Sequence, residues 1–144
     1  MPGQFYQLGA IPTQEVVPGF TARMLHSAHM TFAFWQITAG SLFPEHHHPH
    51  EQVALLLEGR FELTVDGETS VLVPGTVLVI PSNARHSGRA ISDCRICDVF
   101  YPIREDYVGE REIAGGLQAT TDSDNGKPDS LISGLAPGSV LPND

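Results

Sequence analysis

Short runs of apolar residues, rich in β-branched and aromatic side chains, follow one another from about residue 20 to residue 102. Gly, Pro, Asn and Asp separate the runs, and no segment of this region keeps a helical period over three turns. Runs of this kind predict β-strands. The expected strands cover residues 22–26, 30–38, 52–58, 60–65, 68–73, 77–80, 87–90 and 95–101.

One connection between these strands has a specific turn signature. Asp66 and Gly67 separate the runs FELTV and ETSVLV, and a two-residue Asp-Gly loop is a strong hairpin signal. Many short strands at this spacing favour a sandwich or a small closed barrel, since closure removes exposed strand edges. We therefore predict a single all-β domain, and a chain of 144 residues is long enough for one core.

The two ends of the chain lack the strand pattern. Residues 1–19 contain three Pro and are expected to form an N-terminal arm or lead-in strand before a barrel of residues 20–108. Residues 109–144 are rich in Gly, Pro, Ser and Asp and predict a low-complexity C-terminal extension. The start MPGQFYQLGA does not resemble a signal peptide, and no apolar run reaches about 18 residues, so we expect a cytoplasmic protein.

Charge restricts the partners of the protein. Seventeen acidic against eight basic residues give a formal charge of -9, which argues against nucleic acid or an anionic membrane as a partner. Seven of the eight basic residues are Arg. The planar guanidinium of Arg matches a carboxylate, so the net charge does not exclude a small acidic molecule as a ligand. Cys94 and Cys97 have no second pair and point to opposite faces of a predicted strand. We expect them to be small packing residues rather than a redox pair or half a zinc site.

Histidines gather before one of the predicted strands, in the segment EHHHPHE of residues 45–51. In an extended chain His46 and His48 share one face, whereas His47 points the other way. Two imidazoles side by side on a strand suit a single metal ion that takes a further donor from a neighbouring strand. Taken alone, the pattern also fits a run of surface histidines.

Two spaced motifs surround this cluster. They read Gly40-x5-His46-x-His48-x3-Gln52-x6-Gly59 and, fifteen residues later, Gly75-x5-Pro81-x-Asn83-x2-His86. Together they resemble the two motifs of the cupin family, and the resemblance spans about residues 30–102. It implies a double-stranded β-helix (jelly-roll) barrel that holds a divalent transition metal such as Zn, Ni, Fe, Mn or Co. The implied ligands are His46, His48, Gln52 and His86.

This chain departs from the usual cupin motifs at two positions. Asn83 replaces a glycine, and Asn can also adopt the left-handed backbone conformation. Gln52 replaces a glutamate, so a bound divalent ion would keep two positive charges instead of one and be a stronger Lewis acid. The alternative is that Gln52 is an ordinary strand residue and the site is empty. We expect His47 and His50 to face solvent.

Histidines outside the motifs and a carboxylate inside the barrel complete the candidates. His26 and His29 are expected in loops or at the surface. On the predicted strand 95–101, Asp98 and Phe100 share one face, and an inward carboxylate is costly unless a cation or partner is near. Pro102 ends that strand, after which Arg104 can fold over the barrel mouth and bind a substrate carboxylate.

Simpler surface roles are open for the two charged residues. Asp98 can instead pair with Arg89 or Arg95 at the surface. Arg104 can instead pair in solvent with the acidic residues 105–106. The motifs alone do not decide between these alternatives.

A second resemblance favours positions inside the barrel for Asp98 and over its mouth for Arg104. The segments PEHHHPHEQ, LEGRFELTVDGE, VIPSNARHS and DCRICDVFYPIREDY are similar to the small pectin-degradation cupins of the KdgF type, over about residues 34–107. The resemblance implies a homodimeric, metal-dependent isomerase or tautomerase. Its substrates would be cyclic 4,5-unsaturated uronate monosaccharides from pectin or alginate, which it would convert to linear keto forms. Asp98, Phe100 and Arg104 would line the catalytic pocket. The alternatives are a cupin dioxygenase that uses iron and O2, and a non-catalytic cupin that binds a sugar acid.

Overall fold

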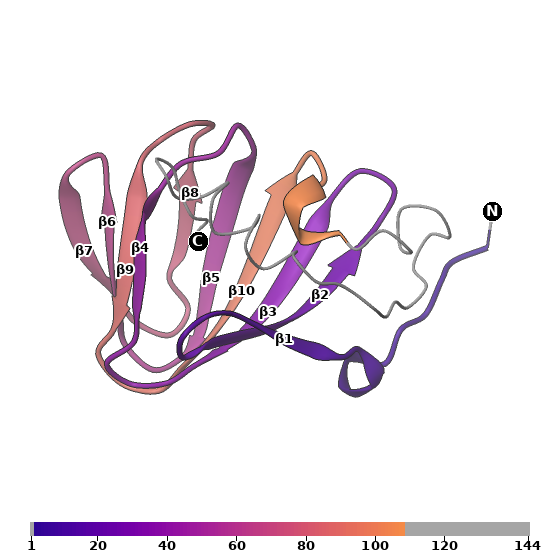
Figure 1. Ribbon diagram of the computed structural model, residues 1–144, viewed down its shortest axis with the longest axis horizontal. Coiled ribbons are helices and arrows are strands. Elements are labelled where there is room, and N and C mark those ends of the chain that lie inside the picture. The colour runs from indigo at the N-terminus through magenta and orange to yellow at the C-terminus, as the bar shows by residue number, and fades with distance from the viewer. Residues whose placement is uncertain (1, 109–144) are drawn as a thin grey trace.

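The structure is a computed structural model that describes residues 2–108 of the chain. This part folds into ten β-strands and two short 3-10 helices (Figure 1). The strands are β1 (Thr13–Val17), β2 (Phe20–His26), β3 (Thr31–Ile37), β4 (Leu42–His46), β5 (Glu51–Glu58), β6 (Phe61–Val65), β7 (Glu68–Leu72), β8 (Val77–Ile80), β9 (His86–Ala90) and β10 (Cys94–Tyr101). The 3-10 helices are η1 (Leu8–Ala10) and η2 (Glu105–Tyr107). No helix of residues 2–108 has the length and apolar character that crossing a membrane requires.

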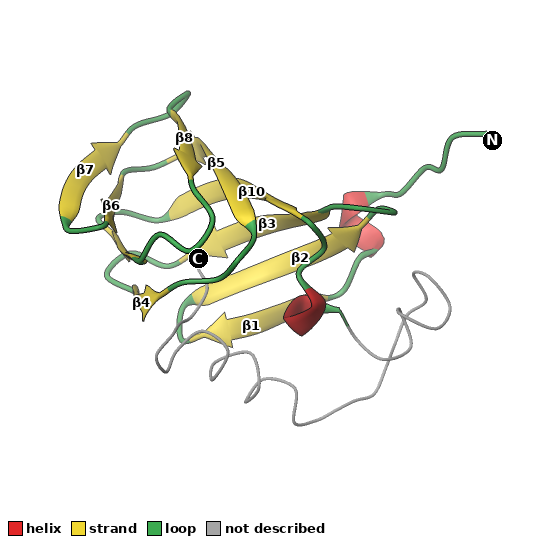
Figure 2. Cartoon of the chain, turned by 90° about the horizontal axis from the view of Figure 1, so that it is seen from above, coloured by secondary structure: helices red, strands yellow, loops and turns green. Residues whose placement is uncertain are grey.

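The strands form two antiparallel sheets that lie over each other (Figure 2). One sheet has six strands in the order β1-β2-β3-β10-β5-β8, and the other has four in the order β4-β9-β6-β7. Phe20 of the large sheet meets Phe43 and Phe61 of the small sheet, with ring centroids 5.0 and 6.1 Å apart. The inner faces are therefore in contact, which confirms the predicted all-β jelly-roll barrel.

Alternation of side chains along the strands decides what lies inside the barrel. Along β3 the residues Thr31, Ala33, Trp35 and Ile37 are buried, with less buried residues between them. The same period of two places Asp98 of β10 on the inner face. The rings of four residues pack edge to face at one end of the interior, where they form an aromatic cluster. The cluster consists of Phe20, Trp35, Phe43 and Phe61.

The outer face of the six-stranded sheet is also apolar over much of its area. The strand register places these residues next to one another in rows: Leu25, Phe32, Phe34, Val53, Leu55, Val77, Val79, Cys97 and Val99. Val77 and Val79 are 58% and 53% exposed. An antiparallel sheet with one wetted face normally carries polar residues there. We call this surface the outer apolar face.

Several local predictions are confirmed. Asp66 and Gly67 both have positive φ angles, 47° and 86°, as a tight hairpin turn requires. Asn83 has a φ of 65°, so it does take the left-handed conformation of the glycine that it replaces. Cys94 is buried and Cys97 half-buried, and both are free.

β4 has no counterpart in the sequence prediction, whereas β1 agrees with the lead-in strand that was one of the two expectations for residues 1–19. β1 lies within residues 1–19 and pairs with β2, so this part of the chain is a lead-in strand. β4 contains Pro44, which a strand tolerates at the edge of a sheet, and β4 is an edge strand of the small sheet. The predicted C-terminal extension, residues 109–144, lies outside the described residues.

Candidate metal centre

Three histidines converge where β4 ends and β9 begins. His46 is the last residue of β4 and is the register partner of His86, the first residue of β9. His48 follows two residues later, in the loop before β5. Candidate ligand nitrogens of the three rings lie within 4.8 Å of one another, and the side chains are only 0%, 6% and 1% exposed for His46, His48 and His86.

Backbone carbonyl groups set the orientation of all three rings. Each Nδ1 atom lies within hydrogen-bond distance of a carbonyl oxygen, which can only accept, so the proton of a neutral ring suits Nδ1. In His48 the Nε2 atom also faces an oxygen, Oε1 of Gln52, and a neutral ring cannot donate to both. The acceptors are the carbonyl groups of Pro44 for His46 at 2.8 Å, His50 for His48 at 3.1 Å and Ala84 for His86 at 2.9 Å. With the proton on Nδ1, Nε2 is the unprotonated atom, which is the arrangement that metal-binding imidazoles adopt.

Burial keeps the imidazoles of His46 and His48 uncharged. It is the main cause that lowers the pKa of His46 well below its usual value, and the neighbouring His86 adds to it. Burial also lowers the pKa of His48, followed by the positive charge of Arg104. Because a metal binds the neutral ring, these shifts favour the ligating form.

Gln52 completes the set from β5. Its Oε1 atom lies 3.1 Å from Nε2 of His48, and its side chain lines the same cavity as the carboxyl group of Asp98, whose pKa it helps to lower. An ionised carboxylate only accepts, so the amide nitrogen faces Asp98 and the oxygen faces His48. Two acceptor atoms without a proton between them repel each other, and a cation that both bind removes the conflict. The three imidazoles and the amide oxygen therefore fit a divalent transition metal.

Asp98 lies on the inner face of β10 and is 3% exposed. Its Oδ2 atom accepts a hydrogen bond of 2.9 Å from the indole nitrogen of Trp35. Burial raises the pKa of Asp98 to about 7, although the hydrogen bonds from Gln52 and Trp35 and the charge of Arg104 oppose this rise. The alternative of a surface ion pair is wrong.

The two arginines that could have paired with Asp98 at the surface form ion pairs with other residues. Arg89 pairs with Glu62, and Arg95 pairs with Glu58. Both pairs lie on the outside of the barrel, whereas Asp98 is on the inside.

Arg104 lies in the segment after β10 and is 1% exposed. Its guanidinium carbon is 4.9 Å from the ring centroid of Phe100 and 4.0 Å from that of Tyr107. Phe100 in turn meets His48 edge to face, at 5.6 Å between centroids. Phe100 thus contacts both the cation and the histidine cluster.

Arg104 also forms an ion pair with Asp106. Nε and one terminal nitrogen of Arg104 donate to the two carboxylate oxygens, at 3.0 and 2.5 Å. The pairing with an acidic neighbour that the sequence left open therefore exists, but the arginine is buried rather than in solvent.

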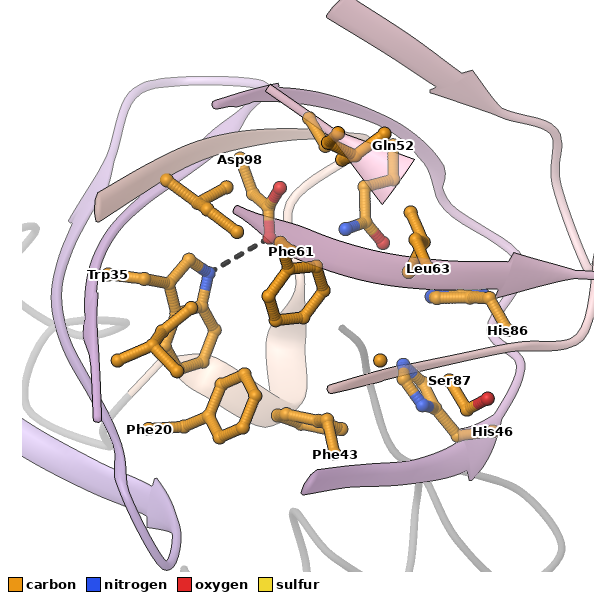
Figure 3. A pocket seen from close by; sticks show the side chains of 15 residues that line it. Phe20, Trp35, Phe43, His46, Gln52, Phe61, Leu63, His86, Ser87 and Asp98 are labelled. Atoms are coloured by element: carbon orange, nitrogen blue, oxygen red, sulfur yellow. Dashed lines mark hydrogen bonds between the residues drawn. The ribbon is translucent and has the colours of Figure 1, made fainter. Parts of the chain in front are cut away.

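A small cavity lies between the histidines and the aromatic cluster (Figure 3). Its volume is about 30 Å³. A water molecule needs about 10–15 Å³ on this measure, so the cavity is too small for a monosaccharide. Its polar wall consists of His46, His86, Gln52 and Asp98, and most of its other lining residues are apolar.

Three of the histidines outside the cluster differ from expectation. His50 is buried, so its predicted exposure is wrong, because the loop turns it under residues 103–106; burial lowers its pKa. His47 is half-buried. His26 ends β2 and is half-buried, where its Nδ1 contacts the hydroxyl of Thr31 at 2.8 Å. His29 is exposed, as predicted.

Sequence reasoning missed two residues beside the site. Trp35 is the hydrogen-bond donor to Asp98, and its only signal was an indole on a predicted inward face. Tyr107 covers the guanidinium of Arg104, and an aromatic residue in an irregular segment gave no signal of this contact.

Comparison with known proteins agrees with the fold and the motifs. The cupin domain family matches residues 33–100. The structure of KdgF from Halomonas sp. is 27% identical, with a TM-score of 0.69, and the match covers 74% of this chain and 100% of that one. Salicylate 1,2-dioxygenase from Pseudaminobacter salicylatoxidans shares the fold at 21% identity, with a TM-score of 0.58 over 60% of this chain and 27% of that one.

A curated relative matches a shorter region. Polyketide synthase CurC from Streptomyces cyaneus is 38% identical over 63 residues, which are 43% of this chain and 41% of that protein. The chain thus matches less than half of the length of CurC. The family match identifies residues 33–100 as a cupin domain, and the fold of the chain is similar to that of KdgF.

Proposed function

We propose that this protein is a metal-dependent enzyme that converts cyclic 4,5-unsaturated uronate monosaccharides to their linear keto forms. One observation carries the proposal. The buried carboxyl group of Asp98 lines the same cavity as Gln52, whose oxygen faces the histidine cluster. A proton-transfer group thus lies directly beside a candidate metal centre. The likeness to KdgF supports the substrate class.

The reaction needs proton movement and no electron transfer. The bond between the anomeric carbon and the ring oxygen breaks, the anomeric hydroxyl loses its proton, and the released enol gains a proton at carbon. Substrate and product are isomers, so no co-reactant is consumed. Asp98 would accept and return the proton.

The other residues would bind and orient the sugar. His46, His48, Gln52 and His86 would hold a divalent metal, which supplies Lewis acidity toward a ring or hydroxyl oxygen when bound. Arg104 would bind the carboxylate of the uronate, and the ring of Phe100 contacts both this cation and His48.

The small cavity limits where the sugar can bind. Because a monosaccharide does not fit between the histidines and the aromatic cluster, we place it on the side that residues 102–108 cover. Arg104 and Asp106 lie in this segment, so a sugar that binds there meets both residues.

The test is to supply an unsaturated uronate monomer and follow the loss of absorbance of its conjugated band. Absorbance should fall with the metal-loaded protein and persist after chelation. A monomer that binds and is recovered unchanged would contradict catalysis and favour a binding cupin. Turnover that stops without oxygen would favour a dioxygenase, because the proposed isomerisation consumes none.

A further inference from the structure

We propose that Asp106 sets the affinity of the site for acidic ligands by competing with the ligand carboxylate for Arg104. This inference rests on the proposed function only in taking a carboxylate as the group that Arg104 binds. It adds a residue that neither the motifs nor the reaction requires. Asp106 acts on specificity and does not touch the reacting atoms.

The ion pair has the geometry of ligand recognition. Two nitrogens of Arg104 donate to the two oxygens of Asp106, and Arg binds free carboxylates in the same two-pronged way. One edge of a guanidinium cannot hold two carboxylates in this way. A ligand that uses this edge must therefore displace Asp106.

The exposed fractions of the two side chains show which of them an arriving carboxylate meets first. The side chain of Arg104 is 1% exposed, whereas that of Asp106 is 24% exposed. Asp106 thus lies on the solvent side of the cation, where an arriving carboxylate first meets it. A buried cation is costly without a partner, so the exchange of one carboxylate for another is favoured over an unpaired intermediate.

Arg104 has anchors that do not depend on Asp106. Its backbone nitrogen donates to the hydroxyl of Thr31 at 3.0 Å, and the rings of Phe100 and Tyr107 contact its guanidinium. These contacts come from β3, β10 and η2. The guanidinium therefore keeps its place when Asp106 is neutralised.

The test measures binding of glucuronate, which has no double bond and so cannot undergo the proposed reaction. Titration calorimetry on the full-length, metal-loaded protein compares wild type with Asp106→Asn, which keeps the shape of the side chain. Loss of a charge-assisted competitor should tighten glucuronate binding by about 10- to 100-fold. Glu105→Gln is the matched control, because Glu105 is an exposed acid on the same 3-10 helix without a bond to Arg104, and it should change affinity little.

Several results would overturn the inference. Unchanged or weaker glucuronate binding by Asp106→Asn would show that Asp106 supports the site instead of competing for it. An equal gain for uncharged glucose would show a general opening of the site. Asp106→Ser serves as a second variant if Asp106→Asn does not fold. Tighter glucuronate binding without turnover of an unsaturated uronate would support the role of Asp106 and reject the proposed reaction.

Discussion

The Nε2 atom of His48 and the Oε1 atom of Gln52 lie 3.1 Å apart, and with the ring proton on Nδ1 neither atom donates to the other. The carbonyl group of His50 lies 3.1 Å from Nδ1 of His48 and favours the proton there, and Asp98 lines the same cavity as the amide of Gln52. The protein therefore maintains a contact that is unfavourable without a cation.

We expect one divalent metal ion per chain, and its removal should destabilise the fold. A bound ion at 100 to 1,000 times its dissociation constant stabilises the folded state by roughly 3–4 kcal/mol, so chelation should lower the melting temperature. Mass spectrometry of the metal content provides the count. His86→Ala should lose the ion, whereas His29→Ala, at an exposed position, should retain it. Full metal content in His86→Ala would show that the centre lies elsewhere.

Asp98→Asn should reduce turnover of an unsaturated uronate by about 10²- to 10⁴-fold, the usual contribution of a positioned proton-transfer group. The amide has nearly the same shape, so metal content should not change. Glu68→Gln, at an exposed position on β7, controls for the loss of one negative charge. If Asp98→Asn keeps full activity, another group transfers the proton.

Acid should destabilise the protein partly through His26. Burial lowers the pKa of His26 from 6.5 to about 4, although a hydrogen bond to the carbonyl of Tyr107 and the charge of Asp106 oppose this. The unfolded chain therefore binds a proton more readily, and this contribution to stability is complete above pH 6.5 and declines as pH falls toward 4.

Denaturant unfolding at pH 7 and pH 4.5 measures the effect. Wild type should lose roughly 2–3 kcal/mol more unfolding free energy between these pH values than His26→Asn. His29→Asn should behave as wild type, because His29 is exposed. Equal losses of unfolding free energy in wild type and His26→Asn would contradict the lowered pKa of His26.

The expected homodimer stays a prediction, and the outer apolar face gives it a specific test. Apolar side chains in adjacent rows favour a protein partner, and a charge at their centre should oppose it. Val99 lies between Phe32 and Val53 in this face. Light scattering should show a dimer for wild type and a monomer for Val99→Glu, while Ser70→Glu on β7 should stay dimeric. A monomeric wild type would reject the prediction.

Strands whose side chains alternate between core and surface were predictable from the sequence. The strand 77–80 agrees with β8 at both ends, and the other predicted strands differ by a few residues at their ends. β4 was missed because Pro44 and Glu45 interrupt its apolar pattern, although His46 ends it. β1 was expected only as one alternative for residues 1–19, without bounds, because its first three residues are polar and exposed.

The candidate site was predictable only as far as local spacing determines it. The motif spacing brought the three histidines and Gln52 to one place, as expected for side chains on neighbouring strands. The burial of His50 and the pairing of Arg104 with Asp106 depend on how residues 102–108 fold back over the barrel. A strand pattern contains no information on that path.

The short strand β4 contributes residues to both the aromatic cluster and the histidine cluster. Phe43 belongs to the aromatic cluster and His46 to the histidine cluster, three residues apart, with their rings 5.0 Å from centroid to centroid. A mutant library that repacks the aromatic rings will therefore also displace an imidazole. Selection for a new metal or a larger ligand will therefore also change the thermal stability of the protein. Ligand preference and thermal stability will evolve together.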